Sequence, residues 1–406
     1  MKKLLIIGYV WPEPKTTGAG VRMMQLIHFF IKNDFQITFT STAEKTEYSE
    51  DLNALGVTEK RIKLNDSSFD IFIKEENPDA VLFDRFYTEE QFGWRVAEIC
   101  SDAMRILDTE DLHFLRKSRE ETVKNVNESP LMLSDIAKRE LASVYRCDLS
   151  LIISEAEIKI LREHFKIDES LLFYLPFLPE STPLEKETLP GFEERNHFIF
   201  IGNYKHQPNV NTVLELKNKI WPLMSEQLPE AELHIYGAYA SDQIKQLHKP
   251  RERFFIKGWV EDAELKIKNA RVMLSPLRFG AGLKGKLIQS MQCGTPSVTT
   301  SIGAEGINSD LPWNGFVEDN TEIFVEKAIA LYLNKELWKE SQHKGFQILY
   351  RRFNSQKFSS SFFEKLQATF SQLKMHRQFN FIGSLLMHHT LQSSKYLSKW
   401  IEEKNK

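Results

Sequence analysis

Short apolar runs alternate with longer stretches of helical periodicity along most of this chain. In the first half, the runs are too short for helices and are bounded by turn residues, so they predict buried strands. The predicted strands are Lys3–Tyr9, Gln36–Ser41, Arg61–Leu64, Ala80–Asp84, Arg105–Thr109, Leu149–Ser154 and Leu171–Leu175. Between them lie amphipathic helices, for example Val21–Lys32, Glu89–Ser101 and Glu155–Phe165. This alternation is typical of parallel sheets covered by helices.

The alternation stops at Leu175–Pro190, which contains four prolines and predicts a linker. A second series of strands follows at His197–Gly202, Glu232–Gly237, Arg253–Trp259, Arg271–Pro276 and Pro296–Thr300. We therefore expect an α/β protein with two Rossmann-like, doubly wound domains, at residues 1–180 and 191–350, facing each other across a cleft. Ligands of such sheets bind at the carboxyl ends of the strands, so the cleft is the expected site.

The tail, residues 351–406, reads as helices that pack back on the N-terminal domain. Its last part, residues 374–406, holds six Lys/Arg and two Glu, a formal charge of 6 − 2 = +4. Apolar residues recur there at helical spacing, from Phe381 to Ile401. A second interpretation is therefore a basic amphipathic contact with a membrane surface.

Composition narrows the function classes. The 406 residues are 42% hydrophobic and 27% charged, as in soluble globular proteins, and the formal charge of −3 gives no basic field for nucleic acid. Three scattered cysteines indicate a reducing compartment and no metal spacing. No apolar run reaches the length of a membrane span, and the start of the chain reads as a buried first strand rather than a signal peptide. We expect a cytoplasmic protein, with peripheral contact at the inner face of the membrane as the tail's alternative.

The most informative segment is Arg271–Gly306, where a strand, the turn Gly280-Ala281-Gly282 and a helix follow one another. Glycines let the backbone approach a ligand, and a helix start offers unpaired N–H groups with partial positive charge. Lys284 and Lys286 add full charges, although both could be surface lysines. The pattern predicts a phosphate or diphosphate site.

The helix of this segment should begin near Leu283 and place Leu283, Leu287, Ile288 and Met291 on the sheet. Gln289 then lies on the opposite side, free to bond a ribose or simply hydrated. Arg278, on the loop before the turn, is either a second phosphate ligand or a rim arginine.

Four further stretches end predicted strands and point to the cleft. Asp108 to His113 brings a titratable histidine there, although Asp108 and Asp111 have capping spacing and Asp108-x-Glu110 is no convincing metal pair. The other three are Gly18-Ala-Gly20, which lacks the third glycine of a dinucleotide fingerprint, Gly202 to Asn209, and Gly258-Trp259-Val260. A tight turn, a helix cap and a core tryptophan are their structural alternatives.

Together these residues resemble the retaining glycosyltransferases of family four, the group 1 transferases with the GT-B fold. The resemblance rests on FIGNYKHQPNV (200–210), on residues 256–300 with the order Pro, Gly-x-Gly, Lys-x-Lys, helix and Gly-x-Pro-x-Val, and on SIGAEGI (301–307). It is looser in the first half and covers about residues 1–350.

The resemblance implies a nucleoside diphosphate sugar bound mainly by the second domain, an acceptor saccharide or lipid-linked acceptor bound by the first, and no metal or cofactor. By position, Lys284 and Arg278 would meet the diphosphate and His113 the reacting sugar. These three would be the catalytic residues. The donor-binding residues would be Gly18, Gly20, Gly202, Trp259, Val260, Gly282, Leu283, Lys284 and Gln289, with Trp259 and Val260 at the base and Gln289 at the ribose.

One departure from the family pattern bears on activity. Many members carry Glu-x7-Glu where this chain has Ala281 and Gln289. A glutamine still bonds a ribose hydroxyl, but an alanine cannot replace a carboxylate. The alternatives are therefore an inactive partner subunit that binds nucleotide sugar, a sugar-nucleotide epimerase of the same fold, and a Rossmann oxidoreductase.

Overall fold

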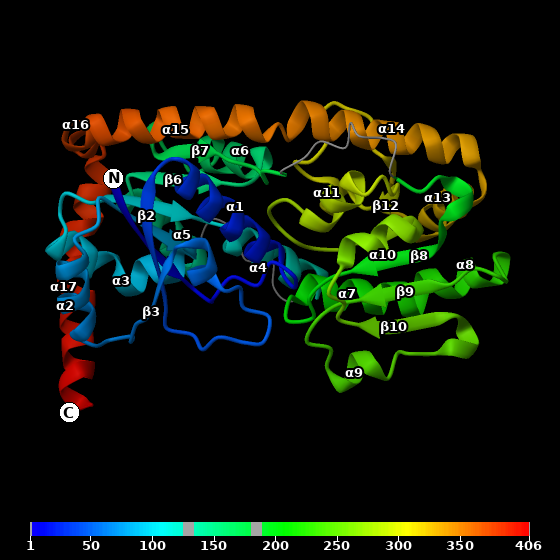
Figure 1. The fold of residues 1–406 in the computed structure, drawn as a ribbon, viewed down its shortest axis with the longest axis horizontal. Coiled ribbons are helices and arrows are strands. Elements are labelled where there is room, and N and C mark those ends of the chain that lie inside the picture. Colours follow the sequence, from blue (N-terminus) through cyan, green and yellow to red (C-terminus); the bar gives the residue numbers. More distant parts are fainter. Residues whose placement is uncertain (1, 125–133, 180–188, 406) are drawn as a thin grey trace.

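The computed structural model describes residues 2–124, 134–179 and 189–405. The predicted α/β architecture is confirmed: two parallel sheets, each with helices on its faces, stand side by side (Figure 1). Part of the predicted linker, residues 180–188, lies outside the described residues.

The first sheet has seven parallel strands in the order β3-β2-β1-β4-β5-β6-β7. Its strands are β1 (Lys2–Gly8), β2 (Phe35–Ser41), β3 (Thr58–Arg61), β4 (Ala80–Asp84), β5 (Met104–Asp108), β6 (Leu149–Ile152) and β7 (Leu172–Tyr174). Its helices are α1 (Gly18–Lys32), α2 (Ser68–Glu76), α3 (Arg85–Ile99), α4 (His113–Val123), α5 (Asp135–Arg146) and α6 (Glu155–Glu163). Buried apolar side chains on both faces of the central strands form two core clusters.

The second sheet has six parallel strands in the order β10-β9-β8-β11-β12-β13. These are β8 (Asn196–Ile201), β9 (Leu233–Tyr236), β10 (Phe254–Gly258), β11 (Ala270–Ser275), β12 (Ser297–Thr299) and β13 (Gly315–Val317). The helices are α7 (Gln207–Glu215), α8 (Trp221–Gln227), α9 (Asp242–Lys245), α10 (Ala263–Asn269), α11 (Gly285–Gln292), α12 (Ser301–Ala304) and α13 (Thr321–Leu333).

The remaining helices carry the chain back to the first domain: α14 (Lys335–Arg352) lies along the second domain and α15 (Ser355–Ser371) along the first (Figure 1). Phe362 and Leu366 of α15 enter the core beside α1. The short α16 (Leu373–Phe379) then leads into α17 (Phe381–Lys404), which packs on α3 and α5. No helix in the described part of the chain is long and apolar enough to cross a membrane.

Three element predictions were wrong in detail. The strand expected at Arg61–Leu64 lies at Thr58–Arg61, an edge strand whose side chains are largely exposed and so leave no apolar run. The edge strand β13 was not predicted because it has only three residues. Helix α11 begins at Gly285 rather than near Leu283, with Lys284 at its N-cap.

Candidate functional site

The Gly280–Gly282 turn lies against the first domain. Gly282 adopts φ = +63°, and its backbone N–H donates a 2.8 Å hydrogen bond to Oε1 of Glu157 in α6. A Cβ at Gly282 would stand 2.8 Å from Cβ of Asp111. Arg119 of α4 also donates to the carbonyl of Gly280 at 2.8 Å and pairs with Glu305 beyond α12. The predicted turn is therefore at the contact between the domains, where glycine is needed for both its dihedral and its size.

Lys284 braces this turn from below. Its side chain is 8% exposed, and Nζ donates to the carbonyl oxygen of Gly282 at 2.8 Å. Burial lowers the pKa of Lys284 to about 8, with Glu305 opposing this and Arg119 adding to it. In this arrangement the amine serves the turn, and its contact with a diphosphate stays a prediction.

Lys286 points the other way along α11. Its Nζ donates to Oδ1 of Asn209, and the amine lies 4.2 Å from the ring centroid of Phe200. Burial lowers the pKa of Lys286 to about 7. The site therefore contains a second, partly desolvated lysine on the opposite side of the glycine turn.

Positive groups from both domains surround His206, in the loop between β8 and α7. Its ring remains exposed to solvent, yet burial and the charges of Arg116, Lys286 and Arg85 lower its pKa to about 3 despite nearby Asp111. An exposed ring with cations of both domains around it marks an opening between the domains. We call Arg85, Arg116, His206 and Lys286 the cation cluster.

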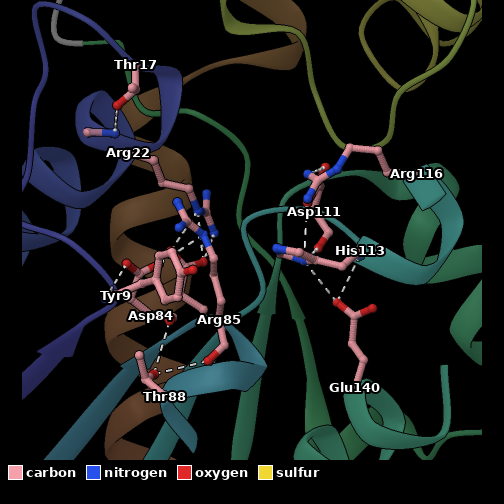
Figure 2. Close-up of polar contacts among 12 residues, drawn as sticks. Tyr9, Thr17, Arg22, Asp84, Arg85, Thr88, Asp111, His113, Arg116 and Glu140 are labelled. Atoms are coloured by element: carbon pink, nitrogen blue, oxygen red, sulfur yellow. Dashed lines mark hydrogen bonds and ion pairs between the residues drawn. The ribbon is translucent and has the colours of Figure 1, made fainter. Parts of the chain in front are cut away.

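His113 is fixed beside this cluster at the start of α4. Its ring Nδ1 lies 3.0 Å from the carbonyl oxygen of Asp111 and 3.3 Å from Oε1 of Glu140 (Figure 2). The same Glu140 accepts the backbone N–H groups of His113 and Phe114, each at 3.0 Å, and so caps the helix. His113 is 8% exposed, so the sequence prediction located it correctly at the strand end but not its burial.

Asp111 links His113 to the cation cluster. Its carboxylate forms an ion pair with Arg116 (Figure 2). Burial would raise the pKa of Asp111, but Arg116, His113 and His206 lower it to about 2. The group is thus held as an anion and partly neutralises the cations around it.

A buried charge network supports the ends of β4 and β5. Arg22 of α1 donates to both carboxylate oxygens of Asp108 at 2.8 and 3.1 Å, and neither side chain exceeds 1% exposure (Figure 2). Asp84 lies opposite Asp108 in the sheet and accepts the backbone N–H of Tyr9 at 2.9 Å. Burial, with Asp108 and Asp84 nearby, raises the pKa of Glu110 to about 8.

The loop Trp11–Gly20 meets the second domain rather than a free cleft. Thr17 caps α1 by accepting the N–H of Gly20, and a Cβ at Gly20 would stand 2.4 Å from the backbone of Glu13. Tyr239 donates to Glu13 at 2.9 Å. Trp259, 37% exposed, donates its indole N–H to the carbonyl of Lys15 at 3.3 Å.

Other predicted residues take mixed positions. Gly202 is needed because a Cβ there would stand 2.6 Å from Cγ of Asn209. Arg278 is exposed and lies 3.9 Å from Glu215 on α7, so it stands apart from the cation cluster. Leu283 is buried as expected, Gln289 is half-buried, and Gly18 stands at the start of α1, near Phe177. Val260 packs, partly buried, on a core of the second domain.

Sequence reasoning missed Arg22, Arg85, Arg116, Glu140, Glu157 and His206. Arg85 directly follows Asp84 at the end of a predicted strand, and that signal could have placed it at the site. The others depend on contacts between distant segments. Among the described residues, no group of three or more His, Cys, Asp or Glu is placed to hold a metal ion.

Comparisons with known proteins agree with this architecture. Residues 195–334 match the family described as glycosyl transferases group 1. An uncharacterized 44.6 kDa protein in the cps region of Klebsiella pneumoniae is 22% identical over 174 residues, 41% of this chain and 45% of the relative, so the match spans less than half of either protein.

Solved structures match over nearly the whole chain. Staphylococcus aureus TarM, in complex with Fondaparinux, alpha-GlcNAc-glycerol and UDP, has a TM-score of 0.68 at 11% identity, covering 91% of this chain and 100% of that one. Sucrose-phosphate synthase of Thermosynechococcus elongatus and Anabaena HepE in complex with UDP and glucose each have a TM-score of 0.64 at 13% identity, with the same coverage. The chain therefore has the GT-B glycosyltransferase fold, and its second domain belongs to the glycosyl transferases group 1.

Proposed function

We propose that this protein transfers a glycosyl group from a nucleoside diphosphate sugar to an acceptor, with retention of configuration and without a metal ion. The observation that carries the proposal is the cation cluster. Two arginines of the first domain and a lysine of the second converge there around an exposed histidine. Such a group of cations at the opening between two domains suits a diphosphate.

The chemical demand of this reaction is the stabilisation of a leaving diphosphate. Lys286, Arg116 and Arg85 would place positive charge where negative charge grows, which is the main source of rate in such sites. Lys286 is the first candidate because its amine faces the cluster through Asn209, whereas Lys284 is bonded to the turn. Lys284 and Arg278 remain candidates for the outer phosphate.

The remaining roles follow from position. His113, held by Glu140 and Asp111, would contact the reacting sugar. Glu110, whose pKa is raised to about 8, could hold a proton near the acceptor. Gln289 would bond the ribose, Trp259 and Val260 would border the base, and Gly18, Gly20 and Gly202 would let the backbone approach the donor.

The substrates are proposed from the relatives. TarM and HepE were solved with UDP, so a uridine diphosphate sugar is the first donor to test. The Klebsiella relative lies in a cps region, which supports a saccharide or lipid-linked acceptor in surface polysaccharide or glycolipid synthesis. Such a role places the protein on the cytoplasmic side of the membrane, with peripheral contact through residues 374–406.

The test measures binding and turnover separately. UDP and UDP-sugars should raise the Tm of the purified chain, because a ligand that binds the folded state stabilises it. Transfer or donor hydrolysis should then be detected, and Lys286→Met should lower kcat/KM by about 100-fold or more. The matched control is Lys339→Met, an exposed lysine of α14, which should leave both unchanged. Stabilisation without any turnover would instead favour the inactive binding subunit, consistent with Ala281 in place of a carboxylate.

A further inference from the structure

The C-terminal helices carry large apolar side chains on their solvent side. Phe379 at the end of α16 is 81% exposed, and Phe381 and Trp400 of α17 are 73% and 61% exposed. Exposed apolar side chains in this number on one element mark an interaction site. We call this set the outward stripe: Phe379, Phe381, Ile382, Leu385, Tyr396, Leu397 and Trp400.

The stripe is continuous on the helix. At 3.6 residues per turn, its six positions on α17 fall within one sector of about 160°. The helix therefore presents one apolar face along its length, from Phe381 to Trp400. This is the geometry of an amphipathic helix.

The polarity of α17 is reversed relative to a helix that completes a core. Its inner face is held by polar contacts: Glu402 pairs with Arg95, and Lys395 donates to Glu98 at 2.6 Å. Gly383 lets the helix approach α5, because a Cβ there would stand 2.1 Å from the carbonyl oxygen of Tyr145. Polar groups thus attach the helix, and the apolar face is left to solvent.

Cations border the outward stripe. Lys374, Lys399 and Lys404 are exposed, and the amine of Lys404 lies 5.2 Å from the ring centroid of Trp400. Residues 374–406 carry a formal +4 (six Lys/Arg, two Glu), although the whole chain carries −3. Lysines beside Trp, Tyr and Phe on one helix are typical of helices that lie in the interface of a bilayer.

The charge and shape of this surface favour a bilayer over a second copy of the chain. A symmetric dimer through the outward stripe would bring like-charged lysines together. A stable dimer also buries about 800 Å² on each partner, and the stripe is only one helix wide. Anionic headgroups, by contrast, attract each lysine near the surface.

We propose that the outward stripe is the site at which this protein binds an anionic lipid bilayer, with the axis of α17 in the plane of the interface. This deepens the peripheral membrane contact of the proposed function, on which it rests. Helix α17 lies at the end of the first domain away from the second domain (Figure 1). Binding there leaves the opening between the domains uncovered.

The experiment is co-sedimentation of the full chain with vesicles of phosphatidylcholine alone or mixed with phosphatidylglycerol. The chain should bind the anionic vesicles, and the variant Phe381→Ser/Leu397→Ser/Trp400→Ser should lose at least tenfold in binding. The control variant replaces side chains of similar exposure elsewhere, Leu265→Ser/Leu333→Ser/Tyr350→Ser, and should bind as the unaltered chain does. All six side chains are exposed, so both variants should fold.

Three results would overturn the proposal: no binding to anionic vesicles, equal loss in both variants, or a dimer in sedimentation velocity that only the stripe variant abolishes. UDP binding and transfer to a soluble acceptor are measured on the same preparations. Loss of vesicle binding with intact transfer removes only the lipid site. Vesicle binding without donor binding or transfer removes the proposed transferase function and leaves the lipid site.

Discussion

Glu157 accepts the backbone N–H of Gly282 across the domain boundary, with 2.8 Å between nitrogen and oxygen. The same oxygen, Oε1, accepts the N–H of Leu112 at 2.9 Å, so one carboxyl group fixes the glycine turn of the second domain to the start of α4 in the first. Its other oxygen is buried without a partner among the described residues. A proton on that oxygen would leave both hydrogen bonds intact.

This arrangement predicts a pH-dependent stability. Burial, with Asp111 nearby, raises the pKa of Glu157 to about 8 from its ordinary 4.5. Because the folded pKa is raised, the contribution is full below the unfolded pKa and is lost as the pH rises through 8. Each pKa unit corresponds to about 1.4 kcal/mol, so the effect reaches a few kcal/mol.

The measurement is the Tm between about pH 5 and 8, the window set by the two pKa values. Glu157→Gln keeps an acceptor oxygen and removes the titration, so its Tm should fall less with pH than that of the unaltered chain. Glu110→Gln is the comparison, because the pKa of Glu110 is also raised to about 8 but its side chain bonds no turn of the second domain. Parallel curves for Glu157→Gln and the unaltered chain would contradict the prediction.

Gly282→Ala tests the close approach of the turn. Alanine meets two penalties there: φ = +63° and a Cβ contact at 2.8 Å with Asp111. Gly56→Ala is a matched control, since φ is +76° but nothing lies within 4 Å of the added Cβ. Each should lose about 1 kcal/mol from the dihedral alone. Only Gly282→Ala should also reduce donor binding and transfer, by tenfold or more, because the turn must shift away from the first domain. Equal activity of the two variants would argue against a functional turn.

The central strands could be predicted because burial on both faces leaves apolar runs in the sequence. Ala80–Asp84 was predicted to the residue. Edge strands carry no such run: β3 is mostly exposed and β13 has three residues, so one was misplaced and the other missed.

The site was predictable only where chemistry and local pattern coincide. The glycine turn announced itself by its spacing. The choice between Lys284 and Lys286 depends on Asn209, which the sequence places in another loop. Arg22 was missed because its partner Asp108 is reached only through the packing of α1 on the sheet.

The Arg22–Asp108 pair predicts a large loss of stability when one partner is removed. Arg22→Met leaves the Asp108 carboxylate buried and uncompensated, which should cost about 3–5 kcal/mol. The double variant Arg22→Met/Asp108→Asn should lose less than the sum of the single losses, because both charges are gone. The control is Arg162→Met, whose exposed pair with Glu169 should contribute no more than about 1 kcal/mol. Urea unfolding followed by fluorescence measures all four, and additive losses would refute a coupled pair.

Donor affinity should depend on pH through Lys286. Burial lowers the pKa of Lys286 to about 7, so the free protein loses this positive charge as the pH rises through 7. Diphosphate binding needs the protonated amine, and the Kd for UDP should therefore increase about tenfold for each pH unit above 7. Lys286→Met should bind UDP weakly with no such slope. Lys284→Met is the matched comparison, because its amine is bonded to Gly282 and its pKa is about 8. If Lys284→Met removes the slope and Lys286→Met retains it, then Lys284 is the diphosphate ligand after all, as the family resemblance alone implies.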